Sequence, residues 1–368
     1  MIKNILFFFV VCTYPLTAQN SFSTNIELEN KDSYSTKEVG FFNKKENIQL
    51  YGTLSIPNKA FEQVIIIVPG SGPDTRDSHP NLSAQFLKNN IAVYRYDERG
   101  VGKSEGSHMP AGYGISQITE DLTYAIEAIK KDELLKNKSI GLLGHSMGGM
   151  ATIGALKSGQ AVDFMIQWAT PVQKHGEFLK YQIKTGRNTF DQVLIYDNIQ
   201  DKIKIVEVVQ KVVENNLSDD HLKLCKKIKK EAKEAGYTKK NYSRFKFWTF
   251  PTMTDLIKQN YESTYKNIEI PILYIIGSND SFVNPESSIE LLNGFNNPNI
   301  ETKIFQGLNH YLRPEINLKS NDPLYEIDTD ACNEIIEWTK QLTIANKEYN
   351  PLAKTTGHIP ERCTAFDE

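Results

Sequence analysis

The sequence predicts an α/β protein with a mostly parallel central sheet, helices on both faces of that sheet and an inserted helical cap. Three observations support this prediction. Short apolar runs, rich in β-branched residues, alternate along the chain with segments of helical periodicity. The runs are nearly continuous in apolar residues, which is typical of strands that are buried on both faces. The alternation stops once, between residues 169 and 270, where only helical patterns occur.

The first elements are a β-hairpin and then strands and helices in turn. Residues 38–42 and 48–57 alternate between apolar and polar side chains around the polar turn NKKEN, as the two strands of a hairpin do. The next expected strands occupy residues 63–69, 91–96, 139–143 and 164–169, and the expected helices occupy residues 82–88, 116–131 and 147–157. Strands joined by helices in this way form a parallel sheet with right-handed crossovers.

The interruption of the pattern is interpreted as a helical cap at residues 171–266. Residues 205–213 and 222–235 each carry one amphipathic stripe. Ser218 is expected to cap the start of the second of these helices, and Gly236 is expected to end it. The α/β pattern then resumes with expected strands at residues 270–276 and 300–305 and expected helices at residues 286–293 and 331–342.

The two ends of the chain do not follow the α/β pattern of this core. Residues 1–18 (MIKNILFFFVVCTYPLTA) combine an early lysine, a short apolar run and a final small residue, the pattern of an export signal. We expect cleavage after Ala18 and a periplasmic or secreted protein. The remaining expected segments are a polar lead (19–37), a first core block (38–170), the cap (171–266), a second core block (267–345) and a polar tail (346–368).

The composition is that of an ordinary globular chain. Of 368 residues, 24% are charged and 40% are apolar, which excludes disordered, collagen-like and coiled-coil classes. No apolar run approaches the roughly 20 residues that a membrane-spanning helix needs. Cys225, Cys332 and Cys363 remain after removal of the signal, and two readings stay open: free thiols, or a bridge between Cys332 and Cys363. The sequence does not indicate an oligomeric state.

The charge is distributed unevenly between cap and core. Residues 171–266 hold 19 Lys and Arg against 12 Asp and Glu, a net charge of +7, whereas the whole chain carries −3. One interpretation is that these charges solvate exposed helix faces. The other is that the basic cap attracts anionic substrates or makes peripheral contact with an anionic membrane surface. No pattern of interleaved basic and aromatic residues indicates nucleic acid.

The strongest chemical motif is GHSMG at residues 144–148, which matches G-x-S-x-G between an expected strand and an expected helix. A serine at such a tight turn is crowded by its own backbone, so glycines are needed two positions before and after it. The turn exposes the hydroxyl above the sheet and directs the N–H of Met147 toward a developing oxyanion. Ser146 is therefore the predicted nucleophile.

A serine nucleophile needs a base, and the base needs an orienting carboxylate. His310 follows the last expected strand, which places it at the same sheet edge as Ser146. Asp280 lies in the loop after the expected strand 270–276, and the order Ser146, Asp280, His310 is the one associated with this motif. His145 is adjacent to the serine, and its side chain is expected to diverge from it.

A second oxyanion donor is expected from the glycine-rich loop after residues 63–69, which reads GSGPDTRD at residues 70–77. Glycines allow backbone N–H groups to approach the oxyanion closely, and the amide of Ser71 is the predicted donor, together with that of Met147. Arg76 and Asp77 are expected to form a local salt bridge rather than to contact substrate.

Three motifs together resemble the α/β-hydrolase superfamily, and specifically its bacterial serine esterases. They are GHSMGG at 144–149, DERGVGKS at 97–104 and GSGP at 70–73. The resemblance covers about residues 38–170 and 267–345 and leaves the cap and both ends uncovered. It implies the α/β-hydrolase fold and a carboxylesterase-like activity.

Two further glycine motifs do not indicate a cofactor. Gly102-Lys-Ser resembles the end of a phosphate-binding loop, but Asp97 stands where its first glycine should be. Gly100 and Gly102 could open a dinucleotide fingerprint, but Glu105 replaces the third glycine. No cofactor and no metal ion are therefore expected.

These observations predict a secreted, cofactor-free serine hydrolase that cleaves a small-molecule ester through an acyl-serine intermediate. Peptidase and thioesterase activities would use the same triad of Ser146, Asp280 and His310, so they remain alternatives. A non-catalytic ligand-binding protein with this fold is the third alternative. The acyl and alcohol parts of the substrate cannot be read from these residues.

Overall fold

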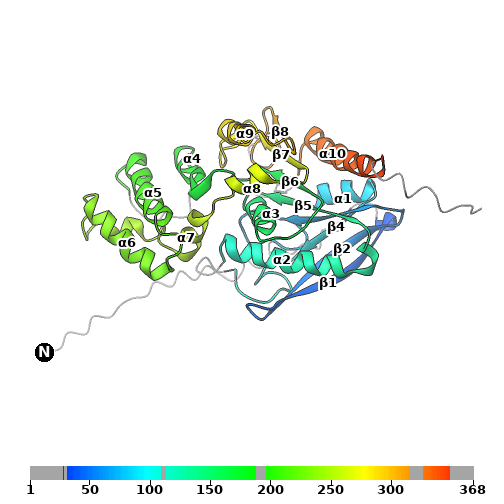
Figure 1. Cartoon of the computed structure of the whole chain (residues 1–368), viewed down its shortest axis with the longest axis horizontal. Coiled ribbons are helices and arrows are strands. Elements are labelled where there is room, and N and C mark those ends of the chain that lie inside the picture. Colours follow the sequence, from blue (N-terminus) through cyan, green and yellow to red (C-terminus); the bar gives the residue numbers. More distant parts are fainter. Residues whose placement is uncertain (1–27, 29–30, 109–112, 188–195, 315–325, 349–368) are drawn as a thin grey trace, which may run out of the picture.

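The computed structural model describes residues 28, 31–108, 113–187, 196–314 and 326–348. Eight strands form one mixed, mostly parallel sheet, and helices flank it (Figure 1). The strands are β1 (Tyr34–Asn43), β2 (Ile48–Pro57), β3 (Gln63–Val68), β4 (Ile91–Tyr96), β5 (Ser139–His145), β6 (Phe164–Trp168), β7 (Ile272–Gly277) and β8 (Ile300–Phe305). The predicted fold class is confirmed.

The strand order in the sheet is β1-β2-β4-β3-β5-β6-β7-β8. β1 pairs with β2, and β2 with β4, in antiparallel fashion, while the pairs from β4 to β8 are parallel. Every residue of β3, β4, β6 and β7 is buried, which explains why these strands are mostly apolar. The carboxyl ends of the parallel strands meet at one edge of the sheet.

The helices of the core follow the predicted alternation with the strands. They are α1 (Pro80–Lys88), α2 (Ile115–Lys131), α3 (Met147–Lys157), α9 (Pro285–Gly294) and α10 (Thr329–Glu348). On α2, a stripe of apolar side chains, including Ile118, Leu122 and Ile126, is fully or almost fully buried. This apolar face packs against α3 and the sheet.

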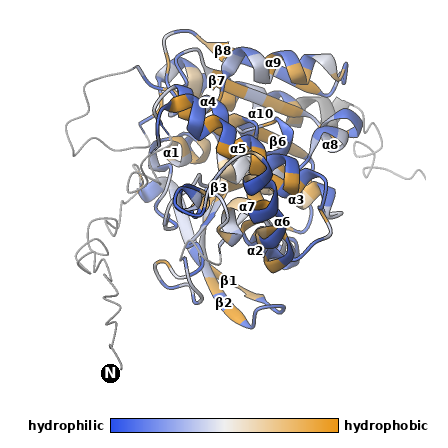
Figure 2. Cartoon of the chain, turned by 90° about the vertical axis from the view of Figure 1, so that its left-hand side faces the viewer, coloured by the Kyte–Doolittle hydropathy of each residue, from blue (hydrophilic) through white to orange (hydrophobic). Residues whose placement is uncertain are grey.

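Along the chain, a group of helices is inserted between β6 and β7. These helices extend to one side of the sheet (Figure 1). These helices are α4 (Phe178–Lys184), α5 (Ile199–Glu214), α6 (His221–Glu234), α7 (Pro251–Lys258) and α8 (Glu262–Asn267). The two amphipathic stripes found in the sequence belong to α5 and α6, which pack against each other. Hydrophilic residues dominate the outer surface of α6 (Figure 2).

Several boundaries differ from the sequence prediction by a few residues, and two of these differences have a clear physical reason. Strand β1 begins at Tyr34 rather than at residue 38, because its first residues are polar and exposed and give no apolar signal. The N-cap of α6 is Asp220 rather than Ser218, and the carboxylate of Asp220 accepts a 2.8 Å hydrogen bond from the N–H of Lys223. Both residue types cap helices well, so sequence alone does not separate them. Gly236, with φ of 90°, follows the C-cap of α6, as expected.

Candidate active site

Ser146 occupies the sharp turn between β5 and α3. Its backbone has φ of 54° and ψ of −119°, a conformation that costs a non-glycine residue on the order of 1–3 kcal/mol. The Ser146 N–H donates a 2.8 Å hydrogen bond to the carbonyl of Trp168 at the end of β6. This contact between neighbouring strands holds the strained turn in place. Met147, predicted to supply an oxyanion N–H, is the first residue of α3.

The glycines of the motif are required by close packing around Ser146. A Cβ atom on Gly144 would lie 2.4 Å from the Cα of Gly149, which is too short for a contact between non-bonded atoms. A Cβ atom on Gly148 would lie 2.2 Å from the carbonyl oxygens of Val68 and Pro69. The physical reason inferred from the motif therefore agrees with the packing at these positions.

Asp280 and His310 lie together in the loops that follow β7 and β8. The Nδ1 atom of His310 is 2.7 Å from Oδ2 of Asp280, and both side chains are buried. The other carboxylate oxygen, Oδ1, accepts hydrogen bonds from the N–H groups of Phe282 (2.7 Å) and Val283 (2.9 Å). The carboxylate is thus fixed in position, and Nε2 of His310 is the ring atom left for proton transfer.

Trp168 links the serine turn to the histidine loop. Its carbonyl binds the Ser146 N–H, and its indole Nε1–H donates a 3.1 Å hydrogen bond to the carbonyl of His310. Sequence reasoning missed this residue. Its position at the carboxyl end of β6 is a signal that could have identified it, since the sheet register places it opposite His145.

His145 packs into a buried cluster of rings beside the Ser146 turn. Its ring centroid lies 4.6 Å from that of Trp168 and 5.1 Å from that of His310, within a buried aromatic cluster. Burial, with smaller contributions from His310 and His79, lowers the pKa of His145 well below its usual value. The ring is therefore neutral at physiological pH, and the nearby carboxylate of Asp280 contacts His310 instead.

The loop after β3 borders the nucleophile. A Cβ atom on Gly70 would lie 3.4 Å from the Cβ of Ser146, so the backbone of this loop packs directly beside the serine. Ser71, the next residue, is exposed, and Gly72 has φ of 139°. The loop is in the right place for an oxyanion donor, while the roles of the Ser71 and Met147 amides remain predictions.

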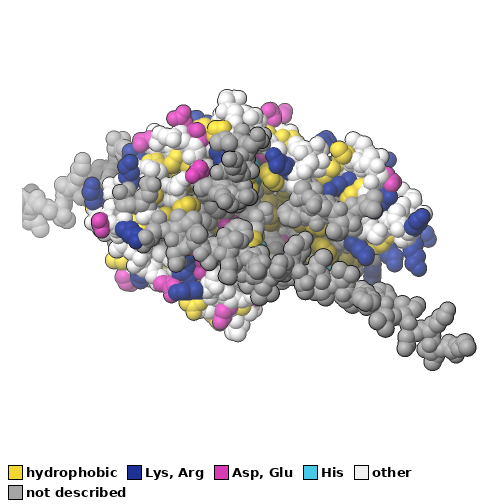
Figure 3. Space-filling model, turned by 180° about the vertical axis from the view of Figure 1, so that it is seen from behind, with side chains coloured by type: hydrophobic (Ala, Val, Ile, Leu, Met, Phe, Trp, Pro, Cys, Tyr) yellow, Lys and Arg dark blue, Asp and Glu magenta, His cyan; other side chains and the backbone are white. Residues whose placement is uncertain are grey.

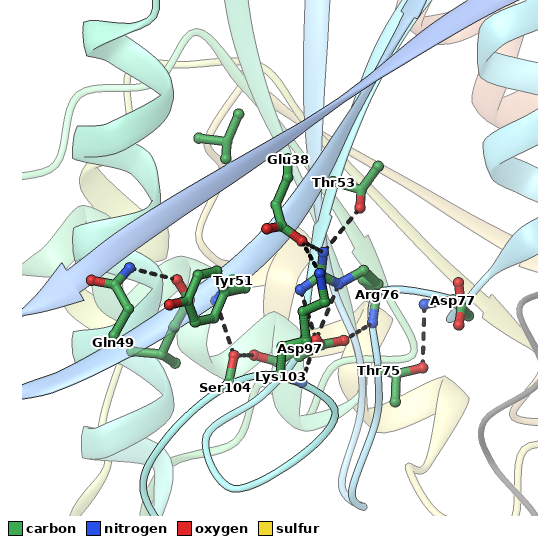
Figure 4. A network of polar contacts seen from close by, with 12 residues as sticks. Glu38, Gln49, Tyr51, Thr53, Thr75, Arg76, Asp77, Asp97, Lys103 and Ser104 are labelled. Carbon is green, nitrogen blue, oxygen red and sulfur yellow. Dashed lines mark hydrogen bonds and ion pairs between the residues drawn. The ribbon is translucent and has the colours of Figure 1, made fainter.

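A polar network holds this loop against the loop after β4 (Figure 4). The carboxylate of Asp97 accepts hydrogen bonds from Nε (3.0 Å) and Nη2 (2.8 Å) of Arg76 and from the N–H of Lys103 (2.9 Å). Glu38, on β1, pairs with both Arg76 and Lys103. The expected salt bridge between Arg76 and Asp77 was wrong, because the Arg76 guanidinium turns toward Asp97 and Glu38 instead.

The helices between β6 and β7 also reach the site. The hydroxyl of Tyr181, on α4, donates a 2.8 Å hydrogen bond to the backbone carbonyl of Asp280. Thr185, next to the end of α4, donates to the carbonyl of Ser281. These contacts connect α4 to the loop that carries the carboxylate.

The described residues also bear on metal binding, membrane spans and disulfides. In those parts of the chain, no three or more His, Cys, Asp and Glu side chains are arranged to hold a metal ion. No helix among the described residues has the length and apolar character needed to cross a membrane. Cys225 and the buried Cys332 are free thiols, and Cys363, the other half of the considered bridge, lies outside the described residues.

Comparisons with known proteins identify the family and support the fold. A sequence model of the family described as serine aminopeptidase, S33, matches residues 59–317. An esterase structure from Pyrococcus furiosus has a TM-score of 0.53 at 19% identity and covers 84% of this chain and 92% of its own. The α/β hydrolase GrgF from Penicillium has a TM-score of 0.52 at 16% identity and covers 84% of this chain and 98% of its own. A search of curated proteins found no match.

Proposed function

Because the chain belongs to the hydrolase family described as serine aminopeptidase, S33, and has the α/β-hydrolase fold, we propose that it cleaves carboxylic esters through an acyl-serine intermediate. The observation that supports this proposal is the placement of a buried Asp280–His310 pair at the sheet edge that also carries Ser146. Trp168 is hydrogen-bonded to both the serine turn and the histidine loop.

In the proposed mechanism, Ser146 Oγ attacks the ester carbonyl while His310 Nε2 takes the hydroxyl proton. The Asp280 carboxylate accepts a hydrogen bond from the Nδ1–H of His310 and stabilises the imidazolium that forms on this ring. The amides of Ser71 and Met147 stabilise the oxyanion of the tetrahedral intermediate. His310 then returns the proton to the leaving alcohol, and water, activated by the same ring, hydrolyses the acyl-serine.

Labelling with a fluorophosphonate probe tests the nucleophile. The wild-type protein should label, and Ser146→Ala should not. Ser158→Ala is the matched control, because Ser158 is an exposed serine just after the end of α3 and should label like wild type. Equal labelling of wild type and Ser146→Ala would disprove the assignment, and absence of labelling in both would favour a non-catalytic protein.

A peptidase is the second candidate, because the matching family is described as serine aminopeptidase. We place esters first because the sequence motifs resemble bacterial serine esterases. A panel of p-nitrophenyl esters, acyl thioesters and aminoacyl arylamides separates the candidates. Hydrolysis of arylamides with a free amino terminus, at rates above those for esters, would reverse the order.

We also propose that the protein is exported, on the basis of the pattern in residues 1–18. Those residues lie outside the described part of the chain. Amino-terminal sequencing of the protein recovered from the periplasm or medium should begin at Gln19. Recovery only from the cell interior, with Met1 retained, would contradict the proposal.

A further inference from the structure

We propose that the outer face of α6 is a docking surface for an anionic lipid membrane. This inference is independent of the proposed hydrolase activity, since it concerns a helix surface remote from the Ser146 turn. It rests on three properties of α6: the pattern of its lysines, the ion pairs of those lysines, and the apolar side chains beside them.

The lysines of α6 are concentrated on its outward face. The helix carries six lysines and two glutamates. Leu222, Lys226, Lys229 and Lys233 are spaced at i, i+4, i+7 and i+11, which places them on one face of a helix. All four are exposed, whereas Leu224, Ile228 and Ala232 are buried on the opposite side. Figure 3 shows Lys and Arg side chains gathered at the end of the molecule that α6 forms.

The lysines of this outward stripe (Lys226, Lys229 and Lys233) are not neutralised by neighbouring carboxylates. Three lysines at the edge of the stripe have acidic partners: Lys223 pairs with Asp220, Lys227 with Asp219 and Lys230 with Glu234. Among the described residues, no carboxylate pairs with Lys226, Lys229 or Lys233. These three ammonium groups therefore present uncompensated positive charge to the solvent, which favours an anionic partner.

Apolar side chains beside the lysines favour a membrane over other anions. Leu222, at the amino-terminal end of the basic face, is 71% exposed. Phe250 is 45% exposed and follows Thr249, whose carbonyl lies 3.8 Å from Sγ of Cys225 on α6. An interfacial helix combines these two features, because its lysines contact headgroups while its apolar side chains enter the boundary with the acyl chains. Free phosphate offers no apolar surface for Leu222 and Phe250 to contact.

Vesicle sedimentation of the full chain tests the proposal. The protein should bind vesicles of phosphatidylcholine mixed with phosphatidylglycerol and bind pure phosphatidylcholine weakly. Raising the salt from about 0.1 M to about 1 M should weaken binding strongly, because the Debye length falls from roughly 10 Å to 3 Å. The triple variant Lys226→Gln, Lys229→Gln, Lys233→Gln should lower the partition coefficient by on the order of 10²-fold. Leu222→Ser should lower the binding that persists at high salt.

The control variant changes the net charge by the same amount at positions away from α6. Lys131 and Lys136 are exposed and Lys340 is partly exposed; all three lie outside the cap, and their triple change to Gln should leave binding within about twofold of wild type. The amino-terminal segment is identical in all variants, so it cannot cause a difference between them. Equal losses in the two triple variants, or equal binding to neutral and anionic vesicles, would overturn the proposal. Binding of duplex DNA without vesicle binding would overturn it in favour of nucleic acid.

Discussion

Three histidine rings, those of His79, His145 and His310, lie close together near the Ser146 turn, and their surroundings differ. The centroids of His79 and His145 are 5.4 Å apart, and those of His145 and His310 are 5.1 Å apart. Of the three, His310 is the ring whose nitrogen lies within hydrogen-bond distance of a described carboxylate, at Asp280. Burial lowers the pKa of His79 to about 3 and that of His145 well below its usual value. Burial therefore disfavours a proton on His79 and His145, whereas the ring of His310 has a carboxylate beside it.

The depressed pKa of His79 predicts a loss of stability in acid. An unfolded chain protonates this imidazole near pH 6.5, whereas the folded protein does so near pH 3. Between these values the unfolded state binds one more proton, so the contribution of His79 is fully present above pH 6.5 and declines as the pH falls. His79→Asn removes it, and Asn tolerates the left-handed backbone at this position, where φ is 52°.

Urea unfolding at pH 7 and pH 5 measures this contribution. Over that interval the free energy of unfolding should fall by about 2 kcal/mol more in wild type than in His79→Asn. Other titrating groups, including the buried Glu98, act equally in both proteins and cancel in the comparison. Parallel losses in the two proteins would show that His79 is already protonated in the fold at pH 5.

At the scale of elements, the approach of α3 to β3 depends on Gly148. Replacing it with alanine would place a methyl group 2.2 Å from two carbonyl oxygens of the chain at the end of β3, and backbone cannot move aside as a flexible side chain can. We expect Gly148→Ala to lower the free energy of unfolding by about 3 kcal/mol and to reduce kcat by moving Ser146. Gly294→Ala, at the end of α9, has open space around its Cβ position and should be nearly neutral in chemical unfolding and in ester hydrolysis. Similar values for the two variants would contradict the steric argument.

Elements with strong local patterns could be predicted from the sequence, and contacts between distant segments could not. The buried strands and the serine turn follow from apolar runs and from the GHSMG motif, which act over a few residues. Asp280 and His310 were predicted because parallel strands bring their following loops to one edge. Trp168 and the partners of Arg76 were missed, since their contacts depend on how strands and loops far apart in sequence are placed.

At the scale of the whole molecule, the residues proposed for catalysis come from two separate blocks of sequence, with helices α4 to α8 inserted between them. The sheet joins the blocks through the pairing of β6 with β7. The inserted helices make a second connection, because Tyr181 on α4 hydrogen-bonds the backbone of Asp280. The segment that contains them, residues 171–266, has a net charge of +7, whereas the whole chain carries −3. This insert is therefore placed to affect both the catalytic loop and the outer surface.

The connection through Tyr181 predicts a specific kinetic effect. Tyr181→Phe removes the 2.8 Å hydrogen bond to the Asp280 carbonyl and keeps the ring, so the loop that orients His310 loses one restraint. We expect a loss of about 1 kcal/mol in stability and roughly a fivefold fall in kcat. Tyr237→Phe is the matched control, because Tyr237 donates a 3.0 Å hydrogen bond to Asp201, and both residues lie within the insert. It should lower the stability by a similar amount and leave kcat unchanged. Steady-state kinetics on a p-nitrophenyl ester, with thermal unfolding of both variants, distinguishes the two effects, and an equal fall in kcat would show that the insert acts only through overall stability.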